Sequence, residues 1–233
     1  MTPSPSFDDL TTAALDRLDA RHVVRAVVQR DGRVLGNARL AKQLGWTGHV
    51  ERVREQLEQL TVLARVTERQ GYDRAVVLGD TTGWADVIGQ HLRGKRGMKV
   101  RGVAGPFALS AVVEWAALGR PLFVVVEGGP WQRTLAQYHI CRARFDHGAD
   151  FVAVGRHGGE AAQLAARAEF REHFVEVGDL RGPFATTGMA GMVPAVLAGV
   201  VITDALARIA ESIEQSTELA AHRNPAAQLG AFL

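Results

Sequence analysis

Five short apolar runs alternate with segments of helical periodicity between residues 74 and 177, and this alternation constrains the fold more than any other feature of the sequence. The runs are "RAVVLG" (74–79), "KVRGVA" (99–104), "LFVVVE" (122–127), "DFVAVG" (150–155) and "HFVEV" (173–177). Between them, helical stretches begin near Trp84, Phe107, Gln132 and Glu160. Buried strands that alternate with helices are typical of a parallel sheet covered on both faces. The sequence therefore predicts an α/β fold, a three-layer αβα sandwich with about five parallel strands.

The segments outside this alternation are expected to be mostly helical. Residues 7–28 have helical spacing, with Leu10, Leu15 and Leu18 available to one face. Apolar side chains in residues 49–71 repeat at steps of three and four, which predicts one long amphipathic helix that stops at Gly71. "VVQRDGRVLG" (27–36) is compatible with a hairpin and with a break between helices. After residue 187 we expect two helices, "MVPAVLAGVV" and "DALARIAESIEQSTELAAHR", and a tail, "NPAAQLGAFL".

These patterns divide the chain into four parts. We expect an N-terminal leader and helix in residues 1–20 and a helical lead-in segment in residues 21–71. The α/β domain follows in residues 72–202, and a C-terminal helix and tail occupy residues 203–233.

The charge balance gives no reason to expect nucleic acid or a membrane as a partner. The chain has 27 Lys and Arg against 25 Asp and Glu, a formal net charge of +2. The short basic stretch "RGKRGMKVR", which begins at Arg93, is expected to be a solvated loop. The most apolar stretch, residues 188–202, contains Pro194 and is shorter than the roughly 18 residues that span a bilayer, so it predicts a buried helix.

Cysteine and histidine usage excludes several classes of site. A single cysteine, Cys141, rules out an internal disulfide framework and suits a reducing compartment. The start "MTPSPSFDDL" lacks the apolar core of a signal peptide, so we expect a cytoplasmic protein. The 8 histidines form no His-x-x-x-His ligand pattern. We therefore expect neither a metal site nor a cofactor.

Three junctions between strands and helices are candidate ligand-binding loops. In a parallel sheet, ligands bind beyond the carboxyl ends of the strands, where helix N-termini present free N–H groups. The junctions are "GDTTGW" (79–84), "EGGPWQRT" (127–134) and "GDLRGPFATTG" (178–188), each with glycine and a hydroxyl side chain. The candidate ligand-binding residues in them are Gly79, Asp80, Thr81, Thr82, Gly83, Glu127, Gly128, Gly129, Gln132, Arg133, Thr134, Arg181 and Thr186.

The acidic residues in these loops argue against a phosphate ligand. Asp80 and Glu127 follow strands that face the expected crevice, and two carboxylates within ~6 Å of a phosphate would repel it. Arginines that would offset this repulsion stand at Arg133, Arg156 and Arg181. One interpretation is a pocket recast for a neutral or cationic molecule. The favoured interpretation is that Asp80 and Thr82 cap a helix while Glu127 lies in solvent or pairs with an arginine.

Two tryptophans are candidates for filling the ligand cavity, and one helix is a candidate for contact with a partner. Trp84 and Trp131 fall in loops that would otherwise hold a ligand, so they either fill that cavity, which we favour, or form a partner surface. Leu206, Ile209 and Ile213 are candidates for an apolar contact face on the last long helix.

The three junctions, in this order, resemble the N-terminal sugar-isomerase (SIS) domain of bacterial glucose-6-phosphate isomerases, including the form fused to transaldolase. The similarity extends from about residue 21 to residue 233. It rests on "LGWTGHVERVREQLEQL", "GYDRAVVLG" and "FATTGMAGMVPAVLAGVVITDALARIAES", and "NPAAQLGAFL" resembles the family's link toward a second SIS domain. The resemblance implies a flavodoxin-like sheet, a sugar phosphate or related small molecule as ligand, and a homodimer or a complex with a metabolic enzyme.

The motifs that hold and transform the sugar phosphate in that family are altered here. The first loop retains Gly79, but the family's serine/threonine-rich second loop is replaced by "VEGGPWQRT". In the third motif, Pro183 occupies the position of the family's arginine and offers neither charge nor donor. The family's base and its ring-opening histidine belong to the part that would follow Leu233.

These departures predict a catalytically degenerate SIS domain without catalytic residues of its own, a pseudoenzyme that acts in binding, regulation or assembly in carbohydrate metabolism. The alternative is an aldose–ketose isomerase of phosphosugars whose missing groups come from a partner chain.

Overall fold

The structure is a computed structural model that describes residues 6–31, 45–79, 83–103, 106–176 and 186–232. The chain separates into two compact units, one made of Met1–Thr47 with Leu206–Leu233 and the other of Gly48–Ala205. The larger unit contains the whole sheet, and it begins within the segment that the sequence assigned to the helical lead-in. The expected boundary near residue 72 therefore does not coincide with a boundary between these units.

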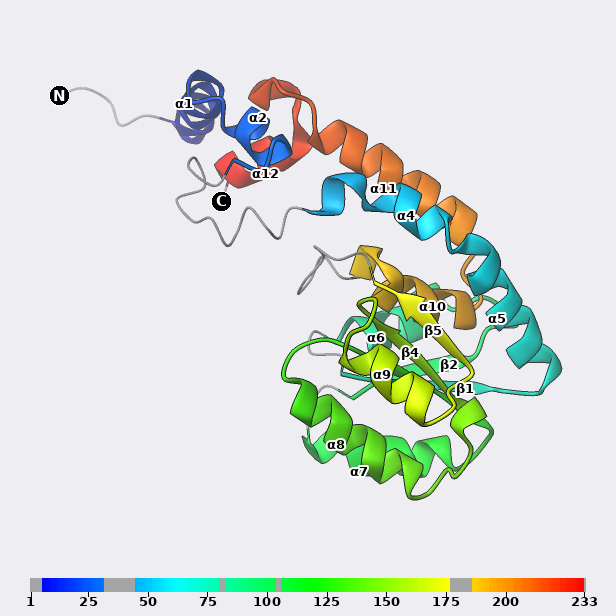
Figure 1. Ribbon diagram of the computed structural model, residues 1–233. Helices are drawn as coiled ribbons and strands as arrows, with labels where there is room; N and C mark the ends of the chain where they lie inside the picture. Colours follow the sequence, from blue (N-terminus) through cyan, green and yellow to red (C-terminus); the bar gives the residue numbers. More distant parts are fainter. Residues whose placement is uncertain (1–5, 32–44, 80–82, 104–105, 177–185, 233) are drawn as a thin grey trace. The chain divides into compact units, whose positions relative to one another are not determined.

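The larger unit is built on a parallel sheet of five strands (Figure 1). The strands are β1 (Arg74–Leu78), β2 (Lys99–Gly102), β3 (Pro121–Val126), β4 (Phe151–Gly155) and β5 (Glu172–Val175), in the order β2-β1-β3-β4-β5. All four neighbouring pairs are parallel. Every residue of β1, β3 and β4 is buried, as expected for strands with helices on both faces. The predicted α/β sandwich is confirmed.

Helices cover both faces of this sheet (Figure 1). On one face lie α7 (Pro106–Ala116), α8 (Trp131–Arg142) and α9 (Glu160–Arg167), which share a core with alternate residues of the strands. Phe151 stacks in that core against Phe123, with ring centroids 4.8 Å apart, and against Phe170 at 5.3 Å. On the other face, α10 (Met189–Leu197) contacts the strands and α5 (Leu57–Arg69). The described part of the chain contains no helix with both the length and the apolarity to cross a membrane.

The two edge strands are protected in different ways. Along β2 runs a π-helical turn, Ile88–Leu92, which continues α6 (Trp84–Val87). A Cβ on Gly89 would lie 2.2 Å from the carbonyl oxygen of Val100, so only glycine permits this approach. The Gly102 N–H donates to Oδ1 of Asp86 at 3.0 Å. Covering the edge in this way removes a site for pairing with another chain.

The other edge strand is paired with a side chain. Gln56 Nε2 donates to the carbonyl oxygen of Val175 at 2.8 Å, and the Val175 N–H donates back to Gln56 Oε1 at 2.9 Å. The amide thus continues the β5 ladder by one step. The prediction of one long helix over residues 49–71 is wrong, because the helix breaks into α4 (His49–Arg54) and α5 where Gln56 makes this contact. The predicted stop is confirmed, since Gly71 has φ 76° and the Tyr72 N–H donates to the Thr67 carbonyl at 3.1 Å.

The smaller unit joins the two ends of the chain. Its helices α1 (Phe7–Ala20), α2 (Val23–Val28) and α12 (Pro225–Phe232) surround a core of Leu15, Val24 and Ala221. The expected C-terminal tail is therefore helical, because the Asn224 side chain accepts from the N–H groups of Ala226 and Ala227 and starts α12. Leu10, expected on one helix face with Leu15 and Leu18, is exposed, whereas Leu15 is buried.

The last long helix, α11 (Ile202–Ser216), spans the division between the units. Leu206 is buried, and Ile209 and Ile213 are half-buried. Leu206 is thus not available for the apolar contact face expected there.

The Gln56 contact with β5 is expected to contribute to stability. Gln56→Ala removes two hydrogen bonds to a strand edge that water can partly replace, so we expect a loss of about 1 kcal/mol in the free energy of unfolding. Urea denaturation measures it. Glu58→Ala, an exposed change nearby on α5, is the control and should lie within about 0.5 kcal/mol of the native protein. Equal losses in both variants would contradict the assignment.

Candidate functional site

The candidate site lies at the carboxyl edge of the sheet, where the strand order reverses between β1 and β3. The structure brings Gly79, Gly128 and Thr134 together there. Gly79 has φ 84°, and a Cβ on it would lie 2.4 Å from the Val126 carbonyl oxygen and 2.7 Å from Thr134 Oγ1. Thr134 is only 1% exposed, so its hydroxyl packs against the β1–α6 turn rather than facing an open crevice.

A buried amide that sequence reasoning missed holds this edge together. The Gly79 N–H donates to Gln137 Oε1 at 3.0 Å, and Gln137 Nε2 donates to the Val103 carbonyl oxygen at 3.4 Å. Gln137 is 4% exposed and lies on α8. Its side chain links the ends of β1 and β2 to that helix. The sequence did contain a signal for this amide. Thr134 and Gln137 are three residues apart, so they lie on the same face of α8, and two polar residues on a buried helix face indicate buried hydrogen bonds.

The Glu127 carboxylate does not face the crevice between β1 and β3, which corrects the expectation from sequence. It turns toward the start of α9, where the Ala161 N–H donates to Oε2 at 3.3 Å. Arg156 donates to Oε1 through Nε at 2.9 Å and lies within 2.8 Å through its terminal nitrogen. The Glu127 side chain is 8% exposed while Arg156 is 61% exposed. The expected pairing of Glu127 with an arginine is thus present, and Arg156 is the partner.

Two glycines make room for this carboxylate. A Cβ on Gly155 would lie 2.6 Å from Glu127 Oε2, and a Cβ on Gly159 would lie 2.3 Å from the same oxygen. These glycines flank Arg156 in the turn between β4 and α9. The segment "GRHGGE" (155–160) was the signal in the sequence, because its glycines indicate a close approach of another group.

A second carboxylate has the same arrangement at α10. The N–H groups of Met189 and Ala190 donate to the two oxygens of Glu176 at 3.0 and 2.7 Å. Glu176 directly follows β5, as Glu127 directly follows β3. Thr186 lies half-buried just before α10, where its carbonyl oxygen would be 1.8 Å from a Cβ on Gly191. Glutamates therefore occupy the N-termini of two helices at the edge where parallel sheets bind anions.

His173 lies on β5, near the Glu127 carboxylate. Its Nε2 is buried and has no hydrogen-bond partner among the described residues. Burial lowers the pKa of His173 below its ordinary value of 6.5, and the nearby His157 adds to this. The Gly155 backbone and the Glu127 carboxylate act in the opposite direction without reversing it. The imidazole is therefore stabilised in its neutral form.

The remaining predicted site residues are dispersed. Gln132 is exposed on the first turn of α8, whereas Gly83 (φ 74°) precedes α6 and Gly129 (φ 59°) precedes α8. Arg133 is exposed on the same turn as Gln132. Asp80, Thr81, Thr82 and Arg181, together with Pro183, lie outside the described residues.

Trp84 and Trp131 are both half-buried. Trp131 packs against the core beneath α8 and α9, including Ala153 and Ala161. It therefore fills space between helices on one face of the sheet.

The single cysteine lies buried in the core beneath α8. Burial raises the pKa of the Cys141 thiol to about 12, which makes it a packing residue. Across the described ranges, no group of three or more His, Cys, Asp or Glu side chains is placed to hold a metal ion.

The Glu127 carboxylate is expected to stabilise the protein mainly through the start of α9. Glu127→Ala should lower the free energy of unfolding by about 1 to 2 kcal/mol, because a buried acceptor at a helix N-terminus is lost. Arg156→Ala should cost less than about 1 kcal/mol, because most of that side chain is in solvent. Denaturant unfolding of both variants measures the difference. A larger loss from Arg156→Ala would contradict this division.

His173 should make stability depend on pH. Because its pKa is lower in the folded protein, the unfolded chain binds the proton more readily, and stability should rise with pH in the window below 6.5 and level off above it. His173→Asn should remove this part of the dependence. Thermal unfolding of both proteins between about pH 5 and 8 tests it, and parallel profiles would show that His173 has no such role.

Comparison with known proteins supports the fold alone. No protein-family model matches the sequence, and no curated protein matches it. The structure is similar to the crystal structure of a hypothetical protein from Thermus thermophilus, with a TM-score of 0.68 and 16% sequence identity. The similarity covers 94% of this chain and 53% of the other, so this chain spans about half the length of its structural neighbour.

Proposed function

We propose that this chain is a SIS-like domain with degenerate catalytic motifs that acts as a binding, regulatory or assembly protein in carbohydrate metabolism. The observation that carries the proposal is the position of Glu127. Its carboxylate occupies the N-terminus of α9 and is held by Arg156 and by the Ala161 N–H. An anion supplied by the protein itself thus stands at the edge where the family resemblance leads one to expect an anionic ligand.

The loop between β3 and α8 supports the same conclusion. In the family that the sequence resembles, this loop supplies the hydroxyl and N–H groups that hold the sugar phosphate. Here Pro130 lacks an N–H, Thr134 is buried against Gly79, and Glu127 is directed to α9. The described loop therefore lacks the family's hydroxyl set, and its exposed polar side chains are those of the first turn of α8, Gln132 and Arg133.

Isomerisation also needs a base and donors for the enediolate. Glu127 and Glu176, the glutamates that directly follow β3 and β5, both accept backbone N–H groups, so neither is presented as a base. In the alignment that the resemblance implies, Pro183 stands at the family's arginine position. These features favour a binding role over an independent isomerase, in a cytoplasmic protein that assembles with a second copy or with a metabolic enzyme.

The competing role is an isomerase completed by a partner chain. The similarity to only 53% of a longer neighbouring chain is the observation that favours it, because such a chain has room for a second domain. The two roles differ in whether a phosphosugar pocket persists.

A coupled assay tests the proposal. Purified protein is incubated with fructose-6-phosphate, and the appearance of glucose-6-phosphate is followed with glucose-6-phosphate dehydrogenase. We expect no interconversion above the uncatalysed background, because the described edge offers no free base and the arginine position holds proline.

Thermal unfolding with fructose-6-phosphate or 5-phosphoarabinonate is the second measurement. A ligand at about 100 times its Kd would add about 2.7 kcal/mol of stability, so a retained pocket is detectable at millimolar ligand. We expect no rise in Tm, with inorganic phosphate and glucose as controls for ionic and crowding effects. A specific rise would favour the partner-completed isomerase instead.

A further inference from the structure

Five cations gather in a short exposed segment of the larger unit. Arg93, Lys95, Arg96, Lys99 and Arg101 are all exposed, and residues 93–101 contain no acidic residue. The whole chain has a net charge of only +2, so this segment is more positive than the rest of the molecule. Lys99 and Arg101 lie on the edge strand β2, in agreement with the strand predicted from residue 99, so the expected solvated loop is limited to the residues before it.

Within the described ranges, no acidic side chain pairs with these cations. The Arg101 guanidinium lies 4.8 Å from the centre of the Trp115 ring, which orients it without compensating its charge. The positive charge is therefore available to a partner.

The backbone that carries them is held in place. The Gly94 N–H donates to the Ala198 carbonyl oxygen and the Met98 N–H to the Leu197 carbonyl oxygen, both at 2.8 Å. A Cβ on Gly97 would lie 1.7 Å from the Ala198 carbonyl oxygen, so the two backbones are in close contact. A segment anchored in this way loses little conformational entropy when a partner binds.

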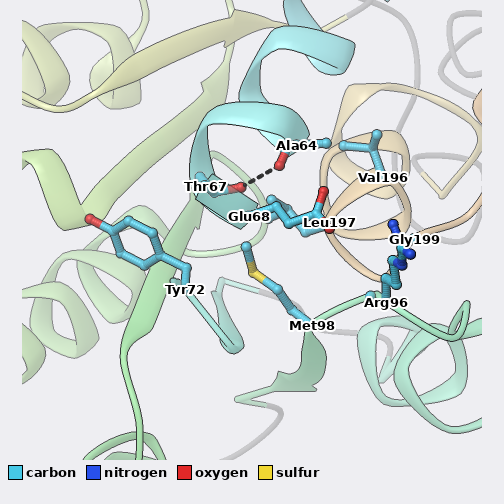
Figure 2. A pocket seen from close by; sticks show the side chains of 10 residues that line it. Ala64, Thr67, Glu68, Tyr72, Arg96, Met98, Val196, Leu197 and Gly199 are labelled. Atoms are coloured by element: carbon cyan, nitrogen blue, oxygen red, sulfur yellow. Dashed lines mark hydrogen bonds between the residues drawn. The ribbon is translucent and has the colours of Figure 1, made fainter. Parts of the chain in front are cut away.

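A small hollow opens beside Arg96 at the amino ends of β1 and β2, on the face covered by α5 and α10, whereas Arg101 lies against Trp115 of α7 on the other face. Figure 2 shows Met98, Leu197 and Val196 around it, with Arg96 next to Gly199. Its volume is about 150 Å³, a size that accommodates one apolar side chain. The Thr67 hydroxyl already donates to the carbonyl oxygens of Leu63 and Ala64, so its donor needs no hydrogen bond from a ligand. Glu68 is the acidic residue in the lining.

We propose that residues 93–101 and the adjoining hollow form a docking surface for an acidic protein segment that inserts one apolar side chain. The cations match acidic side chains, and the hollow supplies an apolar anchor point beside them. A single-stranded nucleic acid fits less well. Both cationic neighbours of Trp115, Arg74 and Arg101, lie over its ring, and Tyr72 is 5% exposed, so neither aromatic group is open to a base.

This inference deepens the proposed assembly role by naming the chemistry of the partner, and it rests on that role only for the existence of a partner. The isomerase assay tests the role, and direct binding tests the surface. Failure of either measurement can therefore be recognised separately.

Fluorescence anisotropy with a labelled glutamate-rich peptide of about 15 residues, with one central leucine, tests the surface at about 50 mM salt. Lys95→Glu combined with Arg96→Glu should weaken binding by at least about tenfold. Arg144→Glu combined with Arg167→Glu reverses two exposed charges elsewhere in the same unit and should change the Kd by less than about twofold. All four side chains are exposed, so the variants should fold.

Two further changes test the hollow. Replacing the central leucine of the peptide with alanine should weaken binding by about tenfold if that side chain is buried. Glu68→Gln removes the carboxylate from the lining and should tighten binding by about threefold.

Several results would overturn the proposal. These are absence of peptide binding at low salt, equal losses in the two double variants, and an unchanged Kd for the alanine peptide. Tighter binding to a short DNA duplex or to phosphatidylserine vesicles than to the peptide would assign the surface to another class of partner.

Discussion

Backbone N–H groups at the start of a helix must find acceptors, and this requirement governs the carboxyl edge of the sheet. Every helix that follows a parallel strand begins there, with N–H groups that have no partner within the helix. In the larger unit, Glu127 accepts from α9 and Glu176 accepts from α10. Gln137 does the same for Gly79 at the turn after β1. Side chains of the chain itself thus satisfy N–H groups at the starts of α9 and α10 and in the turn after β1, and glycines such as Gly155 and Gly159 leave the space that Glu127 needs.

Because side chains of the protein already accept from these N–H groups, an anionic ligand would bind there less favourably. A phosphate that approached α9 would have to displace a carboxylate which is 8% exposed and held by Arg156, and the displaced charge would then repel it. The same N–H groups cannot serve the protein and a ligand at once. A carboxylate at the start of α9 and another at the start of α10 thus keep the geometry that a bound anion would otherwise help to stabilise. Retention of the fold is consequently weak evidence for retention of chemistry.

The strands could be predicted from sequence because burial on both faces leaves uninterrupted apolar runs such as residues 122–126, which few other structures produce. The direction in which a side chain points could not be predicted from the sequence. Glu127 is the residue after β3, and only the positions of Gly155 and Ala161, distant in sequence, decide that it turns toward α9. The break at Gln56 was hidden for a related reason, since the apolar periodicity continues across it and the cause is a contact with Val175. The start of α12 was visible in principle, because Asn224 followed by Pro225 is a helix-start signal.

The two ends of the strands therefore differ in what they offer to other molecules. At the carboxyl edge, Glu127 and Glu176 accept from the N–H groups that begin α9 and α10. At the amino ends of β1 and β2, the glycines of residues 94–99 bring two backbones together and leave the cations around them without acidic partners among the described residues. Burying unpaired charge is costly, so a chain keeps such a group at its surface only in contact with water or with a complementary partner. In a loop that is free to move, hydration by water alone would be enough to stabilise these charges. A backbone fixed by close glycine contacts loses little entropy when a partner binds, and the proposed docking surface, with its hollow of about 150 Å³, thus lies at the end of the sheet opposite to the one where ligands of parallel α/β proteins bind.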